Sequence, residues 1–172
     1  MVNVKIEYRE PFRPFAPSVL SERAGDVFEL EGESPYMLLV APVREEIRRP
    51  FDLAAFRAGV ADMIPEVNKV RSTLPAITHV DYSARVQTVA EADQPEFHAI
   101  LRAFEAATGC PVLVNTSFNV RGEPIVNTPQ DAYRCFMRTD MDLLVLEDCL
   151  LEKVEQPKST EGQEWRKEFV LD

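Results

Sequence analysis

The segment from Asn115 to Val126, NTSFNVRGEPIV, carries the side chains best suited to bind a polar ligand. It follows an apolar run at 111–114 that is typical of a buried strand, and a helix start comes directly after it at 128–131. Ligands of open α/β sheets bind at the carboxyl ends of strands. Ser117 and Asn119 are two residues apart, so on an extended segment they face the same side and could donate to two oxygens of one phosphate or carbonyl. The alternative is that both cap the turn through backbone hydrogen bonds.

Arginines form a second set of candidates. Arg85 opens a predicted strand, so we expect it to project into the crevice at the end of the sheet. Arg9 and Arg13 are four apart on a proline-rich segment and face roughly the same side. Arg121 could contact a phosphate or pair with Glu123. The guanidinium fork binds phosphate or carboxylate through two hydrogen bonds, so these residues predict an anion pocket.

His79 and Asp81 precede Arg85 on the same predicted loop. They could act as a metal ligand with its companion or as an acid/base pair. They could equally be a structural hydrogen-bonding pair. The chain has only two histidines, which excludes a His-rich metal site, and we expect no metal ion held by the protein alone. We assign no catalytic residue.

Composition limits the classes of protein to consider. The chain has 172 residues, 45% of them hydrophobic, which is enough to bury one core. Its net charge of −10 argues against a nucleic-acid partner. An apolar leader and an apolar run of membrane-spanning length are both absent, so we expect a soluble cytoplasmic protein. The three cysteines lack CxxC spacing and lie on apolar stretches, which indicates buried free thiols.

The pattern of elements predicts an α/β fold, with α+β as the alternative. Strands and helices alternate over the last eighty residues as β-α-β-α-β, which indicates a single α/β sheet. We expect one domain over 1–154 and a polar tail or docking helix over 155–172. The predicted elements are an edge strand at 3–8, an extended segment at 9–17, a short helix at 18–24, a buried strand at 36–43, a surface insertion at 44–74 with a helix over 52–62, a helix at 94–108 capped by Asp93, a helix opening with a capping box at Thr128 and Asp131, and a buried strand at 142–147.

Four blocks of the sequence together resemble the carboxyl-terminal domain of the O-carbamoyltransferases, which carbamoylate antibiotics and nodulation factors. They are REPFRPFAP at 9–17, PAITHVDYSARVQTV at 75–89, NTSFNVRGEPIV with the following TPQDA at 115–132, and the stretch from 142 to Lys153. Two positions depart from the family's pattern. Glu7 stands where the family usually has lysine, and Tyr82 stands where it has glycine, which puts the loop geometry around Tyr82 in question.

The resemblance implies a YrdC-like fold, an open, twisted, mixed β-sheet flanked by helices. It implies that this domain uses ATP, with Mg²⁺ accompanying the nucleotide, and carbamoyl phosphate to form carbamoyl-adenylate. An ATPase-fold carbamoyltransferase domain, in cis or in trans, would then pass the carbamoyl group to an acceptor hydroxyl. The residues expected to bind ATP and carbamoyl phosphate are Arg9, Arg13, Arg85, Asn115, Ser117, Asn119 and Arg121. The alternative is a non-catalytic nucleotide-binding, regulatory or structural subunit; a homodimer is a further expectation.

Overall fold

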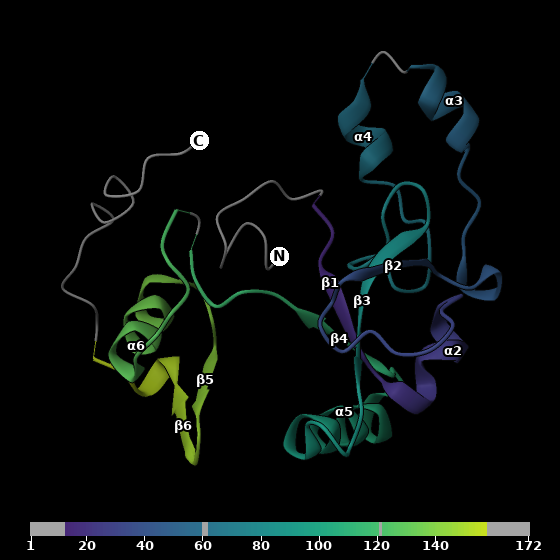
Figure 1. Cartoon of the computed structure of the whole chain (residues 1–172). Helices are drawn as coiled ribbons and strands as arrows, with labels where there is room; N and C mark the ends of the chain where they lie inside the picture. Colours follow the sequence, from purple (N-terminus) through teal and green to yellow (C-terminus); the bar gives the residue numbers. More distant parts are fainter. Residues whose placement is uncertain (1–12, 60–61, 121, 158–172) are drawn as a thin grey trace. The chain divides into compact units, whose positions relative to one another are not determined.

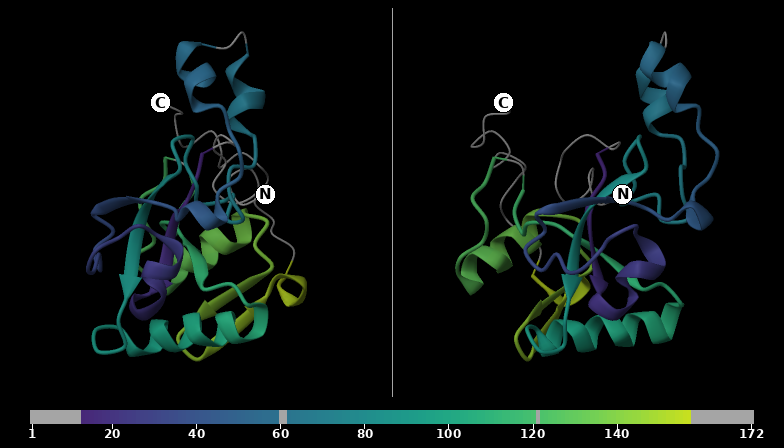
Figure 2. Two further views of the ribbon diagram at one scale, coloured as in Figure 1. Left: turned by 90° about the vertical axis from the view of Figure 1, so that its right-hand side faces the viewer. Right: turned by 45° about the vertical axis from the view of Figure 1, so that its right-hand side comes forward.

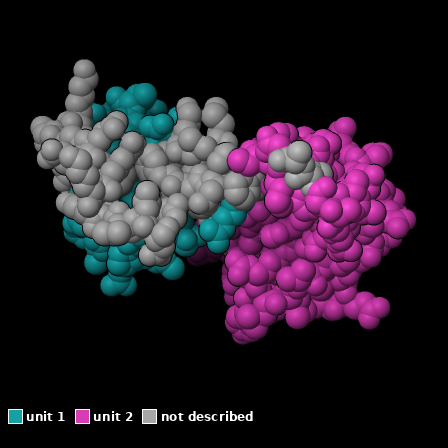
Figure 3. Space-filling model, turned by 90° about the horizontal axis from the view of Figure 1, so that it is seen from above, with its two compact units in different colours: residues 1–13, 117–172 teal, residues 14–116 magenta. Residues whose placement is uncertain are grey.

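The computed structural model describes residues 13–59, 62–120 and 122–157 (Figure 1). The chain divides into two compact units, one formed by 14–116 and the other by 1–13 together with 117–172 (Figure 3). The sequence did not indicate this division. The predicted edge strand at 3–8 and most of the predicted tail lie outside the described residues.

The unit 14–116 is built on a four-stranded mixed sheet in the order β2-β3-β1-β4. Its strands are β1 (Ala16–Leu20), β2 (Leu39–Pro42), β3 (Ser83–Val89) and β4 (Val112–Asn115). β1 and β3 run parallel, whereas β4 pairs antiparallel with β1 and β2 pairs antiparallel with β3. A mixed sheet accompanied by helices confirms the predicted α/β class.

Helix α5 (Pro95–Thr108) packs against β1 and β4 at one end of this sheet (Figure 2). Leu101 of α5 joins Leu20 and Val89 in a buried cluster. The helix ends at Gly109, as predicted, because Gly109 adopts the left-handed conformation with φ 74°. Its N-cap is Gln94 rather than the predicted Asp93, and Gln94 makes no side-chain capping bond.

The segment between β2 and β3 holds two short helices, α3 (Leu53–Ala58) and α4 (Met63–Val67). They stand away from the sheet, at the end opposite α5 (Figures 1 and 2). The helix predicted over 52–62 is present as α3 but is shorter, and α4 follows it as a second helix that was not predicted. Asp52 caps α3 through the amide of Ala55, and the helix stops at Gly59, where φ is 99°.

In this unit the helix predicted at 18–24 is wrong, and the strand predicted at 36–43 is present only in part. Residues 18–24 were predicted as a helix, but 18–20 belong to β1, followed by a 3-10 turn at Ser21–Arg23 and α2 (Ala24–Val27). β1 pairs with a strand on each side, and this tertiary pairing outweighs local helix preference. The strand predicted at 36–43 is shorter and only half-buried, because β2 lies at the edge of the sheet and exposes Leu39 and Val40.

The described part of the other unit contains α6 (Pro129–Arg138) and a hairpin of β5 (Leu143–Leu146) and β6 (Cys149–Glu152), followed by a 3-10 turn at Lys153–Glu155. The capping box predicted at Thr128 and Asp131 is confirmed. Among the described residues β5 pairs only with β6, so the β-α-β-α-β order does not produce one sheet.

The cysteines are free, as predicted, but they are not all buried. Cys135 is buried, Cys110 is half-buried, and Cys149 is exposed at the start of β6. Burial raises the pKa of Cys135 to about 12, with Glu123 adding to the effect, so this thiol is a poor nucleophile at neutral pH. No helix in the described part of the chain is long and apolar enough to cross a membrane.

Candidate functional site

One face of the sheet in the unit 14–116 carries four polar side chains, Ser18, Arg85, Gln87 and Asn115, which we call the polar row. Gln87 Oε1 accepts hydrogen bonds from Ser18 Oγ, over 2.7 Å, and from Asn115 Nδ2. Gln87 Nε2 donates to the carbonyl oxygen of Pro35 over 3.2 Å. These bonds fix Ser18, Gln87 and Asn115; Ser18 is fully buried, so a ligand on this face could reach only the partly exposed amides of Gln87 and Asn115.

Sequence reasoning missed two members of the polar row. Gln87 is a polar residue inside an apolar strand and lies two residues after Arg85, so the period of two could have placed both on one face. Ser18 carried no such signal, because its segment was predicted as helix. Its place beside Gln87 follows only from the parallel pairing of β1 with β3.

Arg85 is the charged member of the polar row and is exposed. It lies within β3, between the buried residues Ala84 and Val86, whereas we predicted it at the start of the strand. Across residues 13–59, 62–120 and 122–157, its guanidinium makes no hydrogen bond and no ion pair. An exposed guanidinium without a carboxylate partner can bind a phosphate or carboxylate through two parallel hydrogen bonds.

The turn at 79–83 leads into Arg85. The amide of His79 donates to the carbonyl of Ser83 over 2.9 Å, and Tyr82 N donates back to His79 O over 3.1 Å. Asp81 Oδ1 accepts from both the amide and the hydroxyl of Ser83, and the hydroxyl holds the pKa of Asp81 below its ordinary value. Asp81 therefore stabilises the turn. No hydrogen bond joins it to His79 among the described residues.

The pKa of His79 depends on the charged groups around this turn. Although its side chain is exposed, desolvation by the protein atoms around it lowers the pKa of His79 below the ordinary value of 6.5. Asp81 opposes this effect, and the positive charges of Arg71 and Arg85 add to it. The neutral imidazole is thus favoured near neutral pH, as a general base would require. Within the described residues, no group of three His, Cys, Asp or Glu side chains is placed to hold a metal ion.

Tyr82 replaces the glycine of the family pattern and keeps a backbone conformation that glycine favours. Its φ is 65°, in the left-handed region. Two contacts offset the cost: the hydroxyl donates to Arg49 O over 2.9 Å, and the Arg48 guanidinium lies 5.3 Å from the ring centroid. The substitution is therefore accommodated without opening the turn.

Arg71 is a residue that sequence reasoning overlooked. It is only 6% exposed. Its guanidinium donates to the carbonyl oxygens of His79 over 3.2 Å, Val67 over 2.8 Å and Glu66 over 3.4 Å. It also lies 5.4 Å from the centroid of the Phe51 ring. Nothing in the charged segment around Arg71 indicated burial, because its acceptors are backbone carbonyls brought together only by the fold.

In the other unit, Asn119 organises its own loop. Its Nδ2 donates to Val120 O over 2.9 Å and to Glu123 O over 3.0 Å, while its Oδ1 is buried without a partner among the described residues. Gly122 has φ 81°, which supplies the turn expected there. Ser117 is exposed. Of the two interpretations of Asn119, this bonding matches the backbone-capping one.

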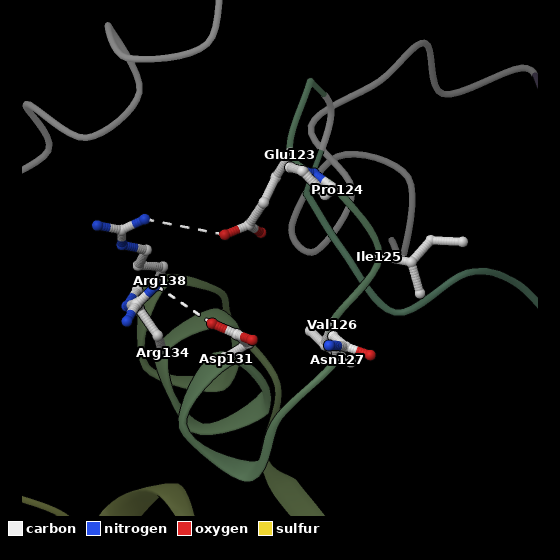
Figure 4. A pocket seen from close by; sticks show the side chains of 8 residues that line it. All are labelled: Glu123, Pro124, Ile125, Val126, Asn127, Asp131, Arg134 and Arg138. Atoms are coloured by element: carbon white, nitrogen blue, oxygen red, sulfur yellow. Dashed lines mark hydrogen bonds and ion pairs between the residues drawn. The ribbon is translucent and has the colours of Figure 1, made fainter.

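A surface pocket of about 400 Å³ lies between the segment 123–127 and α6 (Figure 4). Its wall holds two ion pairs, Arg134 with Asp131 at 3.4 Å and Arg138 with Glu123 at 3.9 Å. Glu123, the suggested partner of Arg121, pairs with Arg138 of α6; Arg121 itself lies outside the described residues, so its own partner stays a prediction. The remaining lining residues are Pro124, Ile125, Val126 and Asn127.

The predicted ligand-binding residues are distributed over both units. Arg85 and Asn115 belong to the unit 14–116, and Ser117 and Asn119 to the other. Arg13 is exposed and has an interaction partner. Arg9 and Arg121 lie outside the described residues. The convergence of these side chains on one phosphate stays a prediction.

Comparison with known proteins identifies relatives. The family described as "Carbamoyltransferase C-terminus" matches residues 1–153. The chain is 60% identical to an uncharacterized protein of Synechocystis over 172 residues, which are all of this chain and 28% of that protein.

Two relatives have informative names. The nodulation protein NolO of Bradyrhizobium diazoefficiens is 37% identical over 95% of this chain and 26% of its own length. The 3'-hydroxymethylcephem-O-carbamoyltransferase of Amycolatopsis lactamdurans is 38% identical over 82% of this chain and 22% of its own length. The match thus spans between 22% and 28% of the length of these three relatives.

Proposed function

This chain belongs to the carbamoyltransferase C-terminal family, and from that premise we propose that it forms carbamoyl-adenylate from ATP and carbamoyl phosphate. The carbamoyl group would then be passed to an acceptor hydroxyl by an ATPase-fold domain, in cis or in trans. The relatives that it matches are several times longer, which leaves room for such a domain.

The observation that carries the proposal is the exposed guanidinium of Arg85 on the polar row, which makes no hydrogen bond or ion pair within the described residues. The face around it is otherwise set by the bonds of Gln87 to Ser18 and Asn115. A polyphosphate needs positive charge and fixed donors rather than a nucleophile from the protein. An exposed arginine on a paired strand, beside the partly exposed and fixed amides of Gln87 and Asn115, meets that need.

The proposed chemistry has two steps. Water and carbamoyl phosphate give carbamate and inorganic phosphate. A carbamate oxygen then forms a bond to the α-phosphorus of ATP, the bond between the α- and β-phosphates breaks, and pyrophosphate leaves with the electron pair. The role of the chain would be to orient the reactants and to neutralise the phosphates, to which Mg²⁺ bound with ATP would contribute.

Exchange of labelled pyrophosphate into ATP tests the proposal. We expect exchange only when carbamoyl phosphate is present, because it supplies the group that is adenylated. Arg85→Ala should abolish exchange, while Arg57→Ala, which removes an exposed arginine of α3, should leave it intact. A chain that binds ATP but supports no exchange would contradict the proposed reaction.

A second candidate is a nucleotide-binding or structural subunit without catalysis. It is favoured by Asn119, whose amide nitrogen is already bonded to two backbone carbonyls of its own loop. Calorimetry with ATP separates the two forms of this candidate, since a purely structural subunit should give no binding heat.

A further inference from the structure

An exposed apolar surface lies beside Arg85 at the edge of the sheet. Tyr36 is 82% exposed, Leu38 77% and Val40 64%; we call these three residues the apolar rim. In the antiparallel pairing of β2 with β3, Val40 lies directly opposite Arg85. Residues paired in this way project from the same face of the sheet with their Cβ atoms about 5 Å apart. Val40 therefore places one end of the apolar rim beside the guanidinium of Arg85.

The segment that carries the apolar rim is held firmly. Ser34 is buried, and its amide donates to Thr88 Oγ1 over 2.8 Å while its hydroxyl donates to Val86 O over 2.8 Å. The Leu39 amide in turn donates to Ser34 Oγ over 3.3 Å. These bonds tie both ends of 34–39 to the sheet, so the exposure of Tyr36 is a property of a fixed segment.

The segment is also joined to the polar row. Pro35, the neighbour of Tyr36, accepts a hydrogen bond from Gln87 Nε2 through its carbonyl oxygen. Gln87 is the residue that holds Ser18 and Asn115. One network of bonds thus fixes the apolar rim relative to the polar groups beside Arg85.

We propose that the apolar rim binds the nucleobase of a nucleotide whose phosphates are bound by Arg85. This inference rests on the proposed function and assigns the base-binding part of its site. A nucleotide joins a flat apolar ring to a polyanion. The surface offers an exposed aromatic and two aliphatic side chains on one segment, whose Val40 adjoins the exposed guanidinium of Arg85. Stacking on an aromatic side chain is favourable for any base, and the held segment lowers the entropic cost of binding.

Calorimetry with two ligands tests the inference, because ATP has a base and inorganic tripolyphosphate has none. Tyr36→Ala should weaken ATP binding about 5- to 100-fold and leave tripolyphosphate binding unchanged. Tyr36→Trp, which keeps an aromatic ring at this position, should bind ATP about as well as the unaltered chain. Arg85→Ala should abolish the binding of both ligands. Val154→Ala, at an 88% exposed apolar residue of the other unit, is the matched control and should change neither.

Each contrary result has a defined meaning. If Tyr36→Ala binds ATP as the unaltered chain does while Arg85→Ala loses binding, the inference is overturned and the proposed function is kept. The apolar rim would then be a surface for a protein partner. An equal loss of both ligands in Tyr36→Ala would also overturn it, since the effect would not depend on the base. If the unaltered chain binds neither ligand, the proposed function fails and the inference fails with it.

Discussion

The Nε atom of Arg71 donates a hydrogen bond to the carbonyl oxygen of His79 over 3.2 Å. The bond joins a guanidinium that is almost fully buried to the first residue of the turn that leads into Arg85. The same side chain bonds the carbonyl of Val67 in α4. Arg71 therefore anchors the α3–α4 insertion and the turn to each other.

Removing this anchor should destabilise the fold. Arg71→Met should lower the free energy of unfolding by about 1–3 kcal/mol, because partly buried carbonyl oxygens lose their charged donor. Urea denaturation measures the difference. Arg57→Met, an exposed arginine of α3, is the control and should change little. Equal loss in the two variants would show that Arg71 has no special structural role.

Replacing Arg85 should impair ligand binding and leave the stability of the fold almost unchanged. Arg85→Ala should abolish binding of ATP or carbamoyl phosphate, yet leave the free energy of unfolding within about 1 kcal/mol of the unaltered chain, as for other exposed residues. Calorimetry and denaturant titration on the same variant check both parts. A variant that binds normally, or one that unfolds, would make Arg85 a structural residue.

His79 reports on the charge near Arg85. Its folded-state pKa is lowered, with Arg85 contributing, so Arg85→Met should raise this pKa and Asp81→Asn should lower it. An anion bound by Arg85 should also raise it. Titration of the imidazole resonances by NMR, with and without ATP, measures each shift. If Arg85→Met leaves the pKa of His79 unchanged, the Arg85 guanidinium lies too far from the imidazole to affect its protonation.

The same shift predicts how His79 affects stability. Because its pKa is lower in the folded chain than in the unfolded one, the unfolded chain takes up the proton first as pH falls below about 6.5. The contribution of His79 to stability is therefore complete above this pH and is lost on acidification toward the folded pKa. His79→Asn should lose less stability than the unaltered chain between about pH 7 and pH 5.

At Tyr82, replacement by glycine should destabilise the fold less than replacement by alanine. With φ at 65°, Tyr82→Gly should be more stable than Tyr82→Ala by about 1 kcal/mol, because both lose the contacts to Arg48 and Arg49 but only glycine accepts this backbone without strain. Urea midpoints of the two variants decide the question. Alanine equal to or better than glycine would mean that the turn rearranges.

Local signals in the sequence were sufficient where structure is local. The capping box at Thr128 and Asp131 and the glycine end of α5 at Gly109 depend on neighbours within a few residues, and both were predicted correctly. β1 was misread because its strand state comes from pairing with β3 and β4, which are distant in sequence. β5 was assigned to the main sheet from the alternation of strands and helices. That alternation carries no information on which strands pair, and β5 pairs with β6.

The candidate site shows the same distinction. Arg85 and Asn115 could be selected from residue type and position, whereas Arg71 and Ser18 acquire their roles through contacts with 79 and 87 that only the fold creates. Gln87 lies between these cases, since it was missed although the period of two could have placed it on the face of Arg85. The apolar rim was missed because β2 was taken as a buried strand.

Direct detection of carbamoyl-adenylate tests the central claim. The chain would be mixed with ATP, Mg²⁺ and isotopically labelled carbamoyl phosphate, quenched early, and the nucleotides separated and identified by mass. We predict a labelled carbamoyl-adenylate that requires both substrates, forms with Arg57→Ala, and is absent with Arg85→Ala. A folded chain that binds ATP and carbamoyl phosphate but yields no labelled adenylate would contradict the account.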